Sequence, residues 1–172
     1  MKYSKIIGTV LTLLFFVCTM EAVAQNGSEE EIQDKGPDSH LLFNTDNVEW
    51  QEGPPSLEPG AEFAVLEGNP SEEGVFTMRI KMPDGYEISP HSHPNVERVT
   101  VLSGTFLLGS GEQMDKENVE TLEAGSYTSM PPEMVHYAIT DGETVIQLTS
   151  IGPWVINYVN EEQDDPRTRS GD

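Results

Sequence analysis

The stretch from Gly85 to Gly104, which reads GYEISPHSHPNVERVTVLSG, constrains the fold of this chain more than any other. Glycine at each end predicts a turn. Successive side chains of a strand point to opposite faces, so His91 and His93, two positions apart, share a face. Two imidazoles followed by the Glu97 carboxylate are ligand types of a transition-metal site. For the histidine pair alone, a solvated surface loop is the alternative interpretation.

A second stretch, Gly125 to His136, reads GSYTSMPPEMVH and supplies a third histidine after a glycine and a proline pair. A strand pattern also fixes the direction of Glu97, which shares its face with Val99 and Val101, whereas Arg98 lies on the opposite face. An inward carboxylate without a partner is costly. A metal ion bound at Glu97 would be that partner.

Together the two stretches resemble the cupin family. Its first motif, G(X)5HXH(X)3-4E(X)6G, is met at every fixed position from Gly85 to Gly104. Its second motif, G(X)5PXG(X)2H(X)3N, is met at Gly125, Pro131 and His136. The chain departs from that motif at residue 133, where glutamate replaces glycine, and at residue 140, where threonine replaces asparagine. A residue other than glycine resists positive φ, so the first departure affects the turn before His136.

The resemblance implies a metal site made of His91, His93, Glu97 and His136. Three imidazoles and a carboxylate suit one divalent transition metal, with Fe, Mn, Ni, Co, Cu and Zn all open. Four protein ligands leave roughly two positions free on a six-coordinate ion. In the cupin family such open sites support O₂-dependent cleavage, decarboxylation, isomerisation or small-molecule binding.

Short runs of alternating hydrophobicity, separated by glycine and proline turns, extend over most of the chain. Residues 75–82 show the pattern best, with apolar side chains at every second position. We also expect an edge strand within residues 41–50 and a hairpin at Asp141-Gly142. The other expected strands are residues 62–66, 97–102, 106–108, 119–122, 126–130, 135–139, 144–150 and 154–159. This pattern, which the cupin resemblance reinforces, predicts an all-β, single-domain cupin jelly-roll β-barrel.

The first 24 residues have the order of a secretory signal peptide: a basic start, the apolar run Ile6 to Cys18, and Ala22-Val23-Ala24 before Gln25. The apolar run is shorter than the about 20 residues of a membrane span, so no stable membrane anchor is expected. Val17 argues against a lipid anchor at Cys18. We expect cleavage near Ala24 and export to the periplasm or the medium. Residues 25–40 are expected to form a flexible acidic linker, residues 41–160 the β-barrel domain and residues 161–172 a polar tail.

Charge excludes two classes of partner. The chain has a net charge of −21, and cleavage would remove two basic residues and one acidic residue, which changes the charge to −22. That field repels nucleic acid and anionic lipid. Cleavage would also remove Cys18, the one cysteine in the sequence, so no disulfide is expected.

These features favour an exported metal-binding cupin that acts on a small organic molecule inside the barrel. If the protein is an enzyme, open positions on a redox metal favour a dioxygenase-type oxidoreductase over an isomerase or decarboxylase. A non-catalytic module that binds or senses a metal or a small molecule is the alternative. A homodimer that pairs through the strand expected at 154–159 is also consistent with the sequence.

No catalytic acid or base is evident from the sequence. Three side chains lie near the predicted ligands along the chain, although turn packing explains them equally well: Tyr86, Glu133 and Tyr137. Tyr127 and Gln147 are candidate hydrogen-bond partners of the histidines. Four methionines lie near the motifs, and core packing is favoured over a pocket lining for them: Met78, Met82, Met130 and Met134.

Overall fold

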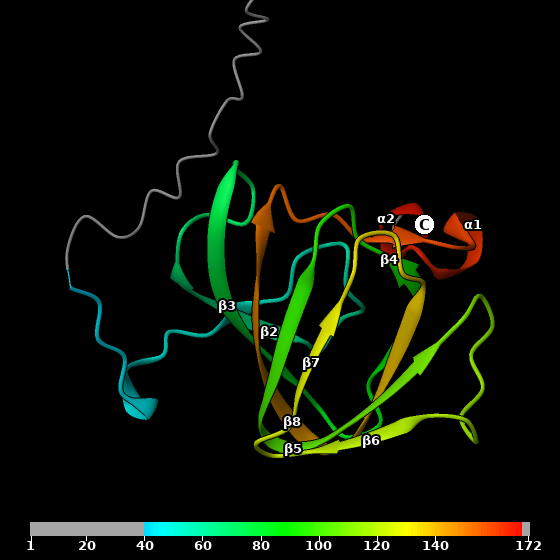
Figure 1. Ribbon diagram of the computed structural model, residues 1–172, viewed down its shortest axis with the longest axis horizontal. Coiled ribbons are helices and arrows are strands. Elements are labelled where there is room, and N and C mark those ends of the chain that lie inside the picture. The colour runs from blue at the N-terminus through cyan, green and yellow to red at the C-terminus, as the bar shows by residue number, and fades with distance from the viewer. Residues whose placement is uncertain (1–39, 170–172) are drawn as a thin grey trace, which may run out of the picture. The chain divides into compact units, whose positions relative to one another are not determined.

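The computed structural model describes residues 40–169 (Figure 1). The predicted signal peptide and the predicted linker, apart from His40, lie outside these residues. Strands dominate the described part, where no helix is long and apolar enough to cross a membrane. The elements are a 3₁₀ helix η1 (Thr45–Asn47), the strands β1 (Gln51–Glu52), β2 (Glu62–Glu67), β3 (Gly74–Met82), β4 (Glu87–Ser92), β5 (Glu97–Ser110), β6 (Glu120–Glu123), β7 (Tyr127–Met130), β8 (His136–Gly152) and β9 (Asn157–Tyr158), and the short helices α1 (Glu161–Asp164) and α2 (Pro166–Arg169).

Two long antiparallel strands, β5 and β8, form the spine of the fold (Figure 1). One half of the sheet has the order β1-β2-β3-β8-β5-β7 and uses the C-terminal part of β8. The other half has the order β9-β4-β8-β5-β6 and uses the N-terminal part of β8. Both long strands therefore belong to both halves, and every strand pair is antiparallel.

The spine bends where its register shifts. The shifts lie between Val101 and Thr105 of β5, opposite residues 141–145 of β8. Gly104 and Gly142 have φ values of 75° and 77°, which a residue with a side chain rarely adopts. This bulge allows the inward side chains of the two halves to face each other.

One core joins the two halves. Phe76, Met78, Ile80 and Met82 of β3 are all buried, as the alternating pattern predicted. They form a single cluster with residues of the other half, among them Phe106 of β5. Antiparallel strands in two facing halves confirm the all-β jelly-roll prediction.

Three local predictions were wrong. Asp141 and Gly142 lie within the bulge of the continuous strand β8 and form no hairpin, because the chain keeps its direction there. Most of residues 41–50 is irregular, with a 3₁₀ turn at 45–47. The strand expected at 154–159 is reduced to Asn157–Tyr158.

Alanine should cost different amounts of stability at the two glycines of the bend, although their φ values are nearly the same. A Cβ at Gly104 would lie 2.4 Å from the carbonyl oxygen of Glu143, whereas a Cβ at Gly142 would meet nothing within 4 Å. Gly142→Ala should cost about 1 kcal/mol from the backbone conformation alone. Gly104→Ala should cost at least about 2 kcal/mol, since the clash adds to the same strain. Urea unfolding of both variants measures the difference, and equal losses would show that the close approach is relieved cheaply.

Candidate metal centre

The four predicted ligands lie at the ends of three strands. His91 lies in β4, His93 directly follows that strand, Glu97 begins β5 and His136 begins β8. His91 and His136 face each other across the β4–β8 pair. All four are buried, with 3–5% of each residue exposed. The fold thus brings together every residue that the sequence analysis selected for the metal site.

Each of the three imidazole rings is held by a main-chain carbonyl. The Nδ1–O distances are 2.7 Å from His91 to Ser89, 2.7 Å from His93 to Val155 and 3.0 Å from His136 to Met134. A carbonyl oxygen accepts a hydrogen bond but cannot donate one, so the proton belongs to Nδ1 in each ring. In the neutral ring Nε2 therefore carries a free lone pair.

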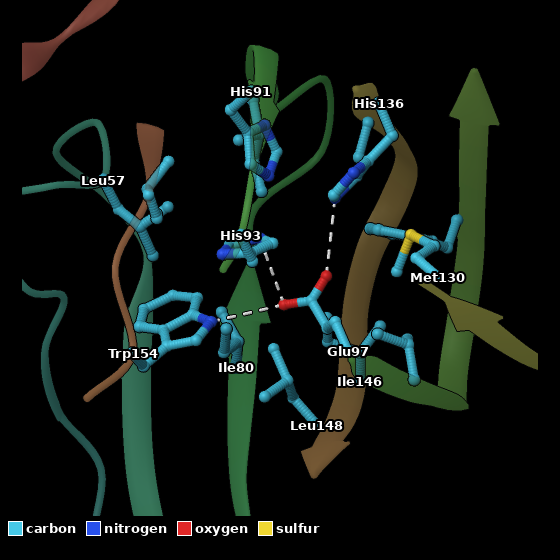
Figure 2. Close-up of a pocket in the computed structure, with 15 residues that line it drawn as sticks. Leu57, Ile80, His91, His93, Glu97, Met130, His136, Ile146, Leu148 and Trp154 are labelled. Atoms are coloured by element: carbon cyan, nitrogen blue, oxygen red, sulfur yellow. Dashed lines mark hydrogen bonds and ion pairs between the residues drawn. The ribbon is translucent and has the colours of Figure 1, made fainter. Parts of the chain in front are cut away.

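The three imidazoles lie together, and two of them, His93 and His136, contact the Glu97 carboxylate (Figure 2). The three histidines each offer a ligand atom, and these atoms lie within 4.8 Å of one another. Glu97 Oε1 lies 3.4 Å from Nε2 of His93, and Oε2 lies 3.4 Å from Nε2 of His136. Among the buried side-chain polar atoms of residues 40–169, Nε2 of His93 is the one without a hydrogen-bond partner.

Burial governs the charge of this cluster. It lowers the pKa of His91 to about 3, helped by His136 and His93. Burial also lowers the pKa of His93. For Glu97 burial raises the pKa, but the surrounding imidazoles outweigh it and lower the pKa to about 2. At neutral pH the centre thus holds a carboxylate beside neutral His91 and His93.

Imidazole lone pairs and a carboxylate that face one another in a buried site repel unless a cation lies between them. Three imidazole nitrogens and one carboxylate oxygen are suitable ligands for divalent transition metals. The unpartnered Nε2 of His93 is the sign that the protein alone does not complete the site. The residues present therefore fit a divalent transition metal.

The surroundings of the four groups are apolar. The cavity at the centre has a volume of about 20 Å³. One water molecule needs about 10–15 Å³ on the same measure, so the cavity accepts a species of that size and no larger organic molecule. Besides the four predicted ligands it is lined by Leu57, Ile80, Ile88, Val99, Phe106, Met130, Ala138, Ile146, Leu148, Trp154 and Ile156.

A family model described as the ChrR cupin-like domain matches residues 38–155. The chain belongs to this cupin family. No curated protein matches the chain.

Solved structures with the same fold include enzymes of different kinds. The polyketide cyclase RemF from Streptomyces resistomycificus has a TM-score of 0.60 at 15% identity, over 75% of this chain and 91% of that one. An acetylacetone dioxygenase from Acinetobacter johnsonii has a TM-score of 0.57 at 19% identity, over 75% and 83%. An RmlC-like cupin from Shewanella frigidimarina has a TM-score of 0.52 at 19% identity, over 67% and 92%. At these identities the likeness establishes the cupin fold alone.

Both departures from the second cupin motif are accommodated. Glu133 adopts the positive φ expected for glycine, 62°, and its N–H donates to the carbonyl of His93 at 2.9 Å. The turn before His136 therefore forms despite the side chain. Thr140 Oγ1 accepts from the N–H of Tyr86 at 2.8 Å and donates to the carbonyl of Pro83 at 2.6 Å, which fixes the turn before β4.

The predicted hydrogen-bond partners of the histidines were wrong. Tyr127 is 60% exposed. Gln147 lies on the outward side of β8, where its Oε1 accepts from Arg79 at 3.3 Å. The main-chain carbonyls of Ser89, Val155 and Met134 accept from the imidazoles instead. The sequence could not predict these acceptors, because every residue has a main-chain carbonyl.

The residues that adjoin the ligands along the chain have other roles in this cupin. Tyr86 donates to the carbonyl of Glu58 at 2.5 Å. Tyr137 packs over Gly109 and donates to the carbonyl of Asp115 at 2.9 Å, outside the cavity. Of the four methionines, only Met130 lines the cavity.

Trp154 is a part of the centre that the sequence analysis missed. Its Nε1 donates to Glu97 Oε1 at 3.4 Å (Figure 2). Its ring stacks on His93 with 5.6 Å between centroids and an interplanar angle of 15°. The next residue, Val155, provides the carbonyl that holds the same histidine. Oε1 of Glu97 thus lies near both the indole N–H and Nε2 of His93, whereas Oε2 faces His136.

The lowered pKa values predict an acid-sensitive metal-free protein. Between pH 6.5 and 4.5 the unfolded chain protonates its histidines, whereas native His91, with a pKa of about 3, stays neutral. The unfolded state then binds more protons, so the free energy of unfolding should fall by on the order of 2 kcal/mol over this interval. Glu97 adds to the fall below its ordinary pKa of 4.5. Urea unfolding of metal-free protein at several pH values should show the loss, and His91→Gln should flatten it. A parent profile that is level over this interval would contradict the assignment.

Trp154→Phe keeps an aromatic ring over His93 and removes the N–H that holds Glu97. We expect the dissociation constant of the bound metal to rise about tenfold, the size found when a ligand loses its hydrogen-bonding partner. Competition with a chromophoric chelator measures this constant. The matched control is Trp50→Phe, because Trp50 is the chain's other tryptophan and contacts Lys81 away from the cavity. Equal constants in both variants would show that the indole N–H does not position Glu97.

Proposed function

We propose that this chain is an exported metal-binding cupin that holds one divalent transition metal through His91, His93, Glu97 and His136 and acts on a small organic molecule, as a dioxygenase-type oxidoreductase. One observation carries the proposal. Three imidazoles, each held by a main-chain carbonyl, place ligand atoms within 4.8 Å of one another, and the buried Glu97 carboxylate lies 3.4 Å from Nε2 of His93 and of His136. No other group of histidine, cysteine or carboxylate side chains in residues 40–169 has a comparable geometry.

A bound redox metal would supply open positions at which O₂ and a substrate oxygen meet. The protein itself would hold the metal in place and shield it from bulk water. The backbone carbonyls orient the imidazoles, and Trp154 orients Glu97. Leucine, isoleucine, valine and phenylalanine side chains keep bulk water from the centre, which strengthens every electrostatic interaction inside it.

Oxygen chemistry is preferred within this class for two reasons. The site has no thiolate, and a mixed imidazole–carboxylate set keeps iron, copper and manganese available. An acetylacetone dioxygenase is among the proteins that share the fold. Acetylacetone is accordingly the first substrate to test, as a compact molecule with two oxygen donors.

A non-catalytic metal-binding or sensing module is the second candidate. The small cavity favours it, since about 20 Å³ admits a water-sized species beside the ligands but no organic substrate. Catalysis on an organic molecule requires a change in the walls of the cavity.

Export is part of the proposal and rests on residues 1–24 alone. Their basic start, apolar run and Ala22-Val23-Ala24 are consistent with a cleaved signal peptide. The strongly acidic composition is consistent with solubility in an extracytoplasmic medium. Comparison of the mature N-terminus with Gln25 by mass spectrometry tests the cleavage site directly.

Metal content is the first measurement. Protein purified without a histidine tag should carry close to one metal per chain by elemental mass spectrometry, and His91→Ala/His136→Ala should lose it. His40→Ala is the matched control, because His40 is the one remaining histidine of the chain and is exposed. Little metal in the parent, even after reconstitution, would rule out the proposed function.

The metal's identity and O₂ consumption together then separate the two candidates. Bound iron or copper, with O₂ consumption in the presence of acetylacetone or a pool of related compounds, supports the oxidoreductase. Stoichiometric metal without O₂ consumption for any compound of the pool supports the non-catalytic module.

A further inference from the structure

A proline-rich segment, residues 53–61, borders the candidate metal centre. It reads GPPSLEPGA, and its ends are closed by a hydrogen bond from the N–H of Gly53 to the carbonyl of Ala61 at 2.8 Å. A turn within it is closed by the N–H of Leu57 and the carbonyl of Pro54 at 2.9 Å. Such a loop, with adjacent ends and three prolines, is a stiff unit.

Leu57 of this segment separates two spaces. On one side it lines the cavity of about 20 Å³ that contains the four predicted ligands (Figure 2). On the other side it lines a surface groove of about 510 Å³, formed by the same segment together with Pro166 and Arg169 of α2. Only 4% of Leu57 is exposed, so its side chain fills the space between them. The groove is within the 300–1,000 Å³ range of small-molecule sites, whereas the cavity is far below it.

We propose that the groove receives the organic substrate and that Leu57 determines specificity, because its side chain controls the route from the groove to the metal. The inference rests on the proposed function, because it gives that metal centre its substrate route. It also resolves the conflict between a reaction on an organic molecule and a cavity that fits only a water-sized species.

The backbone on both sides of Leu57 is fixed, so its side chain is the part that must move. The carbonyl of Ser56 accepts from Tyr158 at 2.8 Å, and the carbonyl of Glu58 accepts from Tyr86 at 2.5 Å. Burial raises the pKa of both phenols, which therefore remain donors at physiological pH. A change of the Leu57 rotamer opens the route without unfolding the segment.

The walls indicate the chemical class of the substrate. Pro54, Pro55 and Pro59 give the groove apolar walls, and the charged side chains of Glu52, Glu58 and Arg169 line it beside them. Beyond Leu57 the polar groups that line the cavity are the predicted ligands and the indole N–H. A compact apolar molecule with one or two oxygen donors for the metal suits the side chains of both spaces, and it enters the cavity only when Leu57 moves. In the apolar cavity a highly charged or sugar-like molecule would lose its hydration without replacement hydrogen bonds.

The test uses the cobalt-loaded chain and two probes with the same metal-binding head, acetohydroxamate and benzohydroxamate. Visible absorption of the cobalt reports their association rates. Leu57→Ala should raise the rate constant for benzohydroxamate about tenfold and that for acetohydroxamate much less, because a gated entrance slows the larger probe more. Met82→Ala is the matched control, since Met82 is equally buried and lines neither space. Its rate constants should equal those of the parent.

A second variant keeps the inference testable if Leu57→Ala does not fold. Leu57→Val shortens the side chain by one carbon with a smaller loss of packing, and it should accelerate benzohydroxamate more than acetohydroxamate. Equal rate constants in the cobalt-loaded parent and the variant that folds would overturn the role of Leu57. Absence of cobalt from the parent would instead overturn the proposed function, and this inference with it.

Discussion

Three hydrogen bonds from imidazole Nδ1 to main-chain carbonyls determine what this cupin can do at its centre. Each bond fixes a tautomer and turns a lone pair inward. Two of the acceptors, the carbonyls of Ser89 and Met134, lie two residues before the histidine that they hold. The third comes from Val155, far along the chain, so His93 is correctly oriented only in the folded protein.

The bent spine makes that convergence possible. Glu97 begins β5 and His136 begins β8, and these strands run antiparallel, so along the spine alone the two residues would lie at opposite ends. The bulge at Gly104 and Gly142 folds one half of the sheet over the other. The start of β5 thereby meets the start of β8, and Oε2 of Glu97 comes within 3.4 Å of Nε2 of His136. Backbone conformation at two glycines far from the site thus sets the geometry of the site.

Much of the fold and the four candidate ligands could be predicted because their signals are local. Strand alternation showed that Glu97 faces inward with the valines, and the motif spacing indicated the histidines. The errors have physical causes as well. Asp141-Gly142 is a hairpin signal, but the same positive φ also serves a bulge in a continuous strand. The prediction that Tyr127 contacts a histidine was wrong because its position in a strand does not show which face of the sheet is buried.

Trp154 and Leu57 escaped sequence analysis for a different reason. Neither belongs to a motif or a regular strand. The indole of Trp154 contacts Glu97, 57 residues away, and the neighbours of Leu57 are held by Tyr86 and Tyr158, 28 and 102 residues from the carbonyls to which they donate. Irregular segments carry little periodic signal, so their contacts follow from the tertiary fold alone. The motif could therefore predict which residues would hold a metal but not how a substrate would reach it. In this chain three of the four candidate ligands lie in strands and His93 directly follows one, whereas Trp154 and the proposed route past Leu57 belong to irregular segments. Change in the loops can thus alter the substrate while the metal centre keeps its geometry.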